Sequence, residues 1–458
     1  MGKGFIFIDG TKSDRSTKRA ARSHAMREKN IGKTHHRGLK PARGKNDLST
    51  SQRNDGRRDI ALSSHRFLDI SDSILLCRPL PPLLSMEFAP WSLEVVKTYF
   101  TSVIMAVYPS KLCLSLDRIK SYWIRTIFLD QTSYHCSLAL MSILNSFVFG
   151  REPVSWEATY HLGQAVALVN EKLDTLDALS NSNLAVVNFL VIRDIFKEDE
   201  AGAKIHLRGL QKMLELRGGL CTVEDRTLAL KIAKRTDIDF ALHYGTPVGF
   251  FRDRMPQAAK ELGMPTYSLV GGSSVFSTLC SAEASPDLWK IFQDVNGLAC
   301  WFNNDVTCDA DPDDLQEIIV SVGYRLVRFC SLGSPPTEAN LNSAYHIGLV
   351  AFLTTLFLKT GGRRFLKYHL VARRLRDIVN RGQHESDKRP LLWLLFMGGI
   401  SVLEESDQPW LLQRIKENTQ LLAIESWTHM QCILCCFPWI HHLHTEPSRH
   451  LWELAVLI

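Results

Sequence analysis

Two short stretches of the chain contain residue types that could bind a metal. The first is the acidic run Asp309-x-Asp311-x-Asp313-Asp314. Aspartate pairs of this kind hold magnesium on a diphosphate in some helical enzymes. A calcium-binding EF-hand loop is excluded, because its sixth position is Asp314 rather than Gly and its twelfth is Val320 rather than Glu. We expect a loop in which Asp311 caps a helix that starts at Pro312, where early acids suit the helix dipole.

The second stretch, near the C-terminus, is Cys432-x2-Cys435-Cys436 followed by His441, His442 and His444. Thiolates and imidazoles are the ligands of tetrahedral zinc sites. The neighbouring side chains are mostly large and apolar, namely Ile433, Leu434, Phe437, Trp439 and Ile440. This pattern is typical of the buried face of a terminal helix that ends at Pro438. We therefore predict no metal here.

No arrangement of nucleophile, base and oxyanion donors is evident, and no phosphate or dinucleotide loop motif appears. Gly271-Gly272-Ser273-Ser274 is expected to be a loop. We expect His161 and His206 to be hydrogen-bonded, partly buried helix residues. The sequence predicts a protein that is not an enzyme and has no cofactor.

A third group of residues could bind polyanions. Residues 1–60 contain 16 Lys plus Arg against 6 Asp plus Glu, a net charge of about +10, whereas the rest contains 38 against 42, about −4. We call residues 1–60 the basic arm and expect disorder in isolation, because it has few large apolar side chains. Its candidate nucleic-acid or import-signal residues are Arg15, Lys18, Arg19, Arg22, Arg27, Lys29, Arg57 and Arg58. The arm could bind DNA phosphates, be read by an import carrier, or be an inert solvated tail.

The location predicted from composition is intracellular. Eleven cysteines are scattered without a disulfide framework, and the apolar stretch Phe5–Ile8 is too short for a secretion signal. The apolar stretches 347–358 and 391–403 are shorter than the roughly 18 residues that span a bilayer. We expect both to be buried core helices.

The periodicity of apolar residues predicts an all-α fold. We expect the basic arm (1–60), a linker (61–90) and one large helical body (91–458). Helices are expected at 156–173, 181–196, 205–217, 228–244, 285–296, 313–331, 337–358, 363–381, 389–403, 407–420 and 424–440. Gly218-Gly219 and Gly245 are predicted to end two of them.

Several motifs of the body occur in an order that resembles a known family. They are His161-Leu162-Gly163-Gln164-Ala165, Val169-Asn170-Glu171-Lys172-Leu173, His206-Leu207-Arg208-Gly209-Leu210, Leu216-Arg217-Gly218-Gly219-Leu220, Asp237-Ile238-Asp239-Phe240-Ala241 with Pro247, and Trp393-Leu394-Leu395-Phe396-Met397-Gly398-Gly399-Ile400 with Trp410, Trp427, Trp439 and Trp452. Together with the basic segment 22–27, they resemble the fungal-specific transcription factor family, in its all-helical regulatory domain, from about residue 15 to the end.

The chain departs from many members of that family at the N-terminus. Those members carry six cysteines of a zinc cluster within about 30 residues. Here the first cysteine is Cys77. We therefore predict that the zinc cluster is absent, and with it the family's established element for reading bases.

The resemblance implies a nuclear regulator of transcription, acting on a biosynthetic gene cluster of secondary metabolism. The expected partners are other transcription regulators or a second copy, bound by the helical body. The arm is expected to meet nuclear import carriers and DNA phosphates, and no membrane partner is expected. Two alternatives stay open: an all-α magnesium enzyme using Asp309–Asp314, and a cytoplasmic interaction scaffold.

Overall fold

The computed structural model describes residues 89–108, 114–150, 155–264, 285–304, 310–333, 341–356, 359–360, 363–364, 366–381 and 388–457. The chain divides into two units, Met1–Arg78 and Pro79–Ile458. All described residues belong to the second unit. The basic arm and Gly271-Gly272-Ser273-Ser274 lie outside the described residues.

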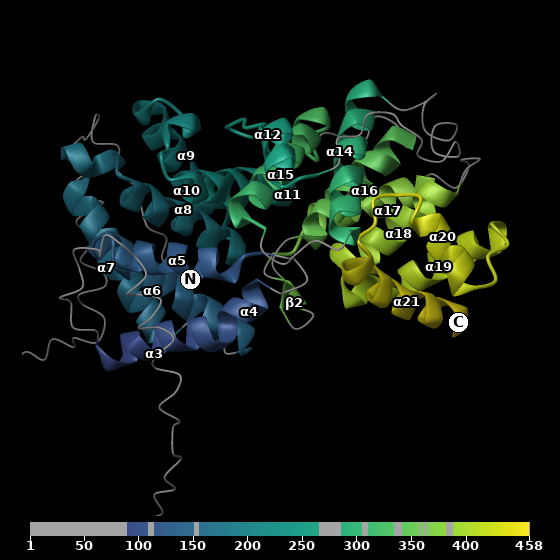
Figure 1. The fold of residues 1–458 in the computed structure, drawn as a ribbon, viewed down its shortest axis with the longest axis horizontal. Helices are drawn as coiled ribbons and strands as arrows, with labels where there is room; N and C mark the ends of the chain where they lie inside the picture. Colours follow the sequence, from purple (N-terminus) through teal and green to yellow (C-terminus); the bar gives the residue numbers. More distant parts are fainter. Residues whose placement is uncertain are drawn as a thin grey trace, which may run out of the picture. The chain divides into compact units, whose positions relative to one another are not determined.

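Apart from turns, connecting segments, one isolated bridge and one short strand pair, the described residues form helices, so the predicted all-α fold is confirmed (Figure 1). The first part of the unit contains α3 (Pro90–Thr98), η3 (Tyr99–Val103), α4 (Ile104–Val107), α5 (Leu116–Ile127), α6 (Gln131–Val148), α7 (Trp156–Lys172), η5 (Leu176–Leu179), α8 (Asn181–Phe196), α9 (Glu200–Arg217), η6 (Leu220–Thr222), α10 (Arg226–Lys231), η7 (Ile232–Ile238), α11 (Asp239–Tyr244) and α12 (Met255–Glu261). The helices η3 and η7 are π-helical, whereas η5 and η6 are 3₁₀ turns.

The later part contains α14 (Pro286–Asn303), α15 (Pro312–Phe329), α16 (Leu341–Thr355), α17 (His369–Arg381), α18 (Arg389–Ser401), η9 (Glu405–Asp407), α19 (Gln408–Leu421), α20 (Trp427–Leu434) and α21 (His441–Leu457). The short strand pair is antiparallel and joins β1 (Lys359–Thr360) to β2 (Arg363–Arg364). Among the described helices, none combines the length and the apolar character that crossing a membrane requires.

Polar caps and glycines determine where several helices begin and end. The hydroxyl of Ser155 accepts from the amide of Ala158 at the start of α7, at 3.3 Å, and Ser180 starts α8 in the same way. Gly218 ends α9 in the left-handed conformation with φ of 102°, and Gly245 ends α11 with φ of 72°. Both predicted glycine stops are therefore confirmed.

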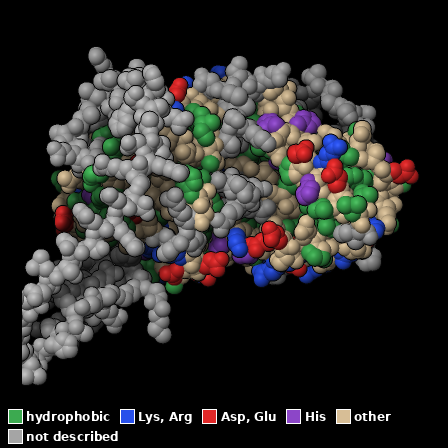
Figure 2. All heavy atoms as spheres, turned by 90° about the horizontal axis from the view of Figure 1, so that it is seen from below, with side chains coloured by type: hydrophobic (Ala, Val, Ile, Leu, Met, Phe, Trp, Pro, Cys, Tyr) green, Lys and Arg blue, Asp and Glu red, His purple; other side chains and the backbone are tan. Residues whose placement is uncertain are grey.

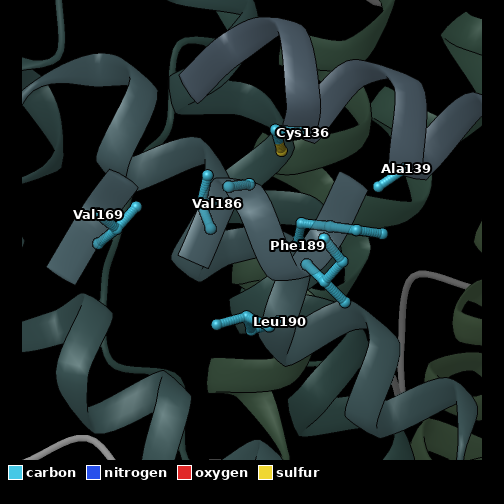
Figure 3. Packing of buried hydrophobic residues seen from close by; sticks show 8 residues of the cluster. Cys136, Ala139, Val169, Val186, Phe189 and Leu190 are labelled. Atoms are coloured by element: carbon cyan, nitrogen blue, oxygen red, sulfur yellow. The ribbon is translucent and has the colours of Figure 1, made fainter. Parts of the chain in front are cut away.

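Two apolar groups form a large part of the core among the described residues. In the first, α6, α7 and α8 pack through Cys136, Ala139, Leu162, Ala165, Val169, Val186, Phe189 and Leu190 (Figure 3). In the second, α16 packs on α18, and both helices are buried on nearly all sides, as expected for the stretches 347–358 and 391–403. Burial of each large side chain contributes about 1.5–3 kcal/mol. An added Cβ at Gly348 would lie 2.1 Å from the Trp393 indole, so this glycine lets the two helices approach.

Four expected helices have a wrong boundary, one of them 285–296, because α14 continues to Asn303. The stretch 424–440 contains only the short α20, because the chain leaves the helix at Cys435, and α21 then begins at His441. α17 begins at His369 rather than at 363, since Arg363–Arg364 pairs with β1. α9 begins five residues earlier than expected, at Glu200, where Asp199 caps it.

Candidate functional site

The predicted polyanion-binding residues all lie in the basic arm, outside the described residues. They are Arg15, Lys18, Arg19, Arg22, Arg27, Lys29, Arg57 and Arg58. Their role therefore stays a prediction. On the face of the body in Figure 2, the described Lys, Arg, Asp and Glu side chains lie intermixed. Over its described part, this face has no extended patch of one sign that would continue a phosphate-binding surface.

The acidic run is placed at the start of α15, apart from Asp309, which lies outside the described residues. Asp311 is the N-cap of α15, where its carboxylate accepts from the amide of Asp313 at 2.9 Å. It also forms an ion pair with Arg118 on α5. The predicted capping role of Asp311 is confirmed.

The next two acids both face the start of α10, where each has its own partner. Asp313 accepts from the hydroxyl of Thr227 at 2.7 Å, and Asp314 lies 2.7 Å from Arg226 on α10. Burial raises the pKa of Asp313, and burial together with Glu261 raises the pKa of Asp314 to about 6. Each carboxylate therefore already has a cationic or hydroxyl partner, which does not favour a magnesium site.

A buried ion network continues from this point along α15. Glu317 is fully buried and accepts two hydrogen bonds from Arg252, at 2.5 and 2.8 Å. Its carboxylate also accepts from Arg226 at 3.4 Å. Because Arg252 belongs to the segment after α11, this pair holds that segment on α15.

The cysteine and histidine stretch is divided between α20 and α21. His444 is buried, and its Nδ1 accepts from the amide of Ile440 at 3.0 Å while its Nε2 lies 2.9 Å from the hydroxyl of Thr355. Burial lowers the pKa of His444 to about 3. Both ring nitrogens are thus engaged by protein atoms. Within the part of the chain that the structure describes, no three His, Cys, Asp or Glu side chains are arranged to hold a metal.

His206 and His161 are both buried and hydrogen-bonded. His206 Nδ1 lies 2.7 Å from Asp194, which joins α9 to α8. His161 Nδ1 lies 2.7 Å from Nδ1 of His135, and burial together with His135 lowers the pKa of His161 to about 4. Ser92 lies 3.5 Å from the other His161 nitrogen, an arrangement with the residue types of a nucleophile and its base. Since Ser92 is 1% exposed, a substrate cannot reach it, and the group has a structural role.

Sequence reasoning missed a polar centre on the π-helical segment η7, within the stretch 228–244 that was predicted to be one helix. Asp237 accepts hydrogen bonds from the amides of Gly249 and Phe250, at 2.7 and 2.8 Å, and from the hydroxyl of Tyr324 on α15 at 2.9 Å. Burial outweighs these hydrogen bonds and raises the pKa of Asp237 to about 6. Asp237 therefore joins three parts of the chain.

Other polar residues of the same region are also buried. Thr236 donates to Asn188 on α8, and Asp239 accepts from Tyr368 just before α17 at 3.1 Å. Burial lowers the pKa of Lys234 well below its ordinary value. The available sequence signal was the density of polar residues, Lys234, Arg235, Thr236, Asp237 and Asp239, inside an otherwise apolar segment. π-helical turns often occur at functional positions. Here the geometry provides long-range connections, and the Lys234 amine is buried out of reach of a substrate.

The matching family model is described as the fungal specific transcription factor domain and covers residues 97–244. The match runs from the end of α3 to the last residue of α11, so it includes the paired histidines and the η7 polar centre. It is shorter than the resemblance, which extends from about residue 15 to the end. No curated protein and no solved structure matches the chain. Residues 97–244 thus match the fungal specific transcription factor domain.

Proposed function

We propose that this protein is a nuclear, non-enzymatic regulator of transcription. The observation that carries the proposal is the fungal specific transcription factor domain at residues 97–244. In the proposed mechanism, the helical body binds other regulators or a second copy, while the basic arm brings the protein to the nucleus. A biosynthetic gene cluster of secondary metabolism is the proposed target, on the strength of the family resemblance.

The contacts of the three described aspartates of the acidic run support a non-enzymatic role. Asp311, Asp313 and Asp314 are engaged with Arg118, Thr227 and Arg226, respectively. An all-α magnesium enzyme would need such carboxylates free to share one ion. We therefore favour the regulator over that alternative.

The charge of the basic arm supports two proposed roles, namely import of the protein into the nucleus and nonspecific affinity for DNA. A segment with a net charge of about +10, on a remaining chain of about −4, attracts polyanions through counterion release, which gives salt-dependent binding with little base selectivity. In this proposal, targets are chosen by partners of the helical body, because the zinc cluster that reads bases in other members is not predicted here.

The proposal is tested by locating fluorescent fusions of the full chain and of a form lacking residues 1–60, combined with chromatin crosslinking. A more specific test compares two double variants, each of which removes two positive charges. Arg57→Gln with Arg58→Gln alters the arm, whereas Arg208→Gln with Lys212→Gln alters two exposed cations of α9 by the same amount. We expect removal of the arm to abolish nuclear accumulation and the arm pair to weaken it, and the α9 pair to leave it unchanged.

Equal distributions of the full chain and the truncated form, with no chromatin recovered, would contradict the proposal. That outcome would favour a cytoplasmic scaffold with an inert arm. Nuclear accumulation without chromatin recovery would retain the import role of the arm and reject the transcriptional role.

A further inference from the structure

The outer face of α7 carries exposed aromatic and small side chains in one stripe. Trp156, Tyr160, Gly163 and Ala167 recur at intervals of three or four residues, which places them on the same side of the helix. Trp156 is 61% exposed and Tyr160 is 45% exposed. The opposite face of α7 is buried in the first core group, so the stripe points away from the body.

The two aromatic side chains are held in place by a third ring. The ring of Trp91, on α3, lies 5.0 Å from that of Trp156 and 5.6 Å from that of Tyr160. Trp91 in turn lies 4.7 Å from the buried His161 ring. Aromatic residues that are already fixed lose little conformational entropy on binding, and Trp and Tyr are the commonest anchors of protein interfaces.

The stripe has no formal charge at its exposed positions between Trp156 and Asn170, and Glu157 lies at its half-buried flank. The outer face of α9 differs, because Ile205 is accompanied there by the exposed charges of Arg208, Lys212 and Glu215. In a two-fold dimer, one surface meets its own copy. An uncharged face can do so without placing like charges together.

Gly163 is unusual for a residue in the middle of an exposed helix. A Cβ added to it would meet nothing within 4 Å, so the fold does not need a glycine there. Alanine at this position would be the better helix former. A glycine does allow the backbone of a second helix to come close, with Tyr160 and Ala167 on either side of the contact.

We propose that two copies of this chain associate through α7, with the two helices crossing at Gly163 in a two-fold dimer. Tyr160 of each copy then packs beside Ala167 of the partner subunit, a large side chain on a small one. Trp156 covers the edge of the contact. This inference rests on the proposed function, in which the helical body supplies the protein contacts, and it names a second copy as the partner.

The test measures the mass of the full-length chain in solution by light scattering after gel filtration. Nuclease treatment and elevated salt prevent nucleic acid from bridging the arms. We expect about twice the chain mass of 51.9 kDa for the wild type. Ala167→Glu should raise the dimer Kd at least about tenfold, because it buries a carboxylate against its own copy. Ala201→Glu, at an exposed alanine of α9, is the matched control and should leave the dimer intact.

Circular dichroism checks that each variant is folded, and Tyr160→Ala replaces Ala167→Glu if the latter is not. A monomeric wild type at all concentrations would overturn the proposal, as would a dimer that resists Ala167→Glu, Tyr160→Ala and Gly163→Glu. A folded monomer that binds a different protein through this stripe would also overturn it. Since the measurement uses neither localisation nor chromatin, it can fail independently of the proposed function.

Discussion

The buried pair of Glu317 and Arg252 holds the segment after α11 on α15. Substitutions in this pair can measure how much it contributes to the free energy of unfolding. Glu317 accepts two hydrogen bonds from Arg252 and a longer one, 3.4 Å, from Arg226. Arg226 has a second partner, Asp314, at 2.7 Å. The two members of the buried pair are therefore not equivalent, and replacing one is expected to cost more than replacing the other.

Glu317→Met leaves Arg252, a residue that is 6% exposed, without the carboxylate that accepts its two described hydrogen bonds. Removing one partner of a buried ion pair costs about 3–5 kcal/mol. Arg252→Met leaves Glu317 with Arg226 still beside it, so we expect a smaller loss of about 1–3 kcal/mol. The double variant leaves no unpaired charge and should lose less than the sum of the two.

Urea unfolding of the full chain at neutral pH gives the free energy of unfolding and its dependence on denaturant for the wild type and the three variants. An unchanged denaturant dependence shows that the variants unfold from the same folded state. Equal losses for Glu317→Met and Arg252→Met would refute the role given to Arg226. Strict additivity in the double variant would refute the pairing itself.

Substitutions at four single positions test other parts of the structure. Gly348→Ala should lower the free energy of unfolding by about 1–3 kcal/mol, because its Cβ would lie 2.1 Å from the Trp393 indole. Gly163→Ala should raise the free energy of unfolding of the monomer by about 0.5–1 kcal/mol, because its Cβ would meet nothing within 4 Å. Thermal unfolding measures both. The pKa of Asp237 is raised from 3.8 to about 6, which means that the folded state binds the carboxyl proton more tightly than the unfolded state does. The protonated carboxyl therefore adds about 3 kcal/mol to the free energy of unfolding below pH 4, and this contribution is lost as pH rises through 6. In Asp237→Asn, the free energy of unfolding should fall less steeply with rising pH than in the wild type. An equal slope in the variant and the wild type would contradict the raised pKa of Asp237. Asp311→Ala should cost about 1 kcal/mol through the lost cap, and magnesium should leave the melting temperature of the wild type unchanged. A magnesium-dependent rise that Asp311→Ala abolishes would revive the enzyme alternative.

The helices most faithfully predicted from the sequence are those whose ends carry local signals. The expected helix 156–173 corresponds to α7, and 181–196 corresponds to α8, since Ser155 and Ser180 cap them and apolar residues recur at helical spacing. Asp311 could likewise be predicted as a cap, because the sequence Asp-Pro-Asp-Asp combines an N-cap, proline at the first helical position and early acids.

Features that depend on distant contacts could not be predicted. The residue types around His444 are those of a zinc site, although the apolar neighbours favoured a core helix. The partner of His444, Thr355, is 89 residues away in the chain and could not be predicted. The polar centre on η7 has the same origin, because the partners of Asp237 and Asp239 come from later segments. A helical pattern also cannot distinguish an α-helix from a π-helical turn, since the difference lies in hydrogen bonds rather than in residue types.

The hydrogen bonds of the polar centre on η7 indicate that the folded unit extends beyond the segment matched by the family model. The matched segment stops at Tyr244, at the end of α11. Yet Asp237 is satisfied by Gly249, Phe250 and Tyr324, and Asp239 accepts from Tyr368, all of which lie beyond that point. Cutting the chain there would leave two buried carboxylates without these donors, at a cost of about 1–3 kcal/mol for each lost partner. The domain is therefore the first part of a larger folding unit that extends at least to Tyr368, just before α17.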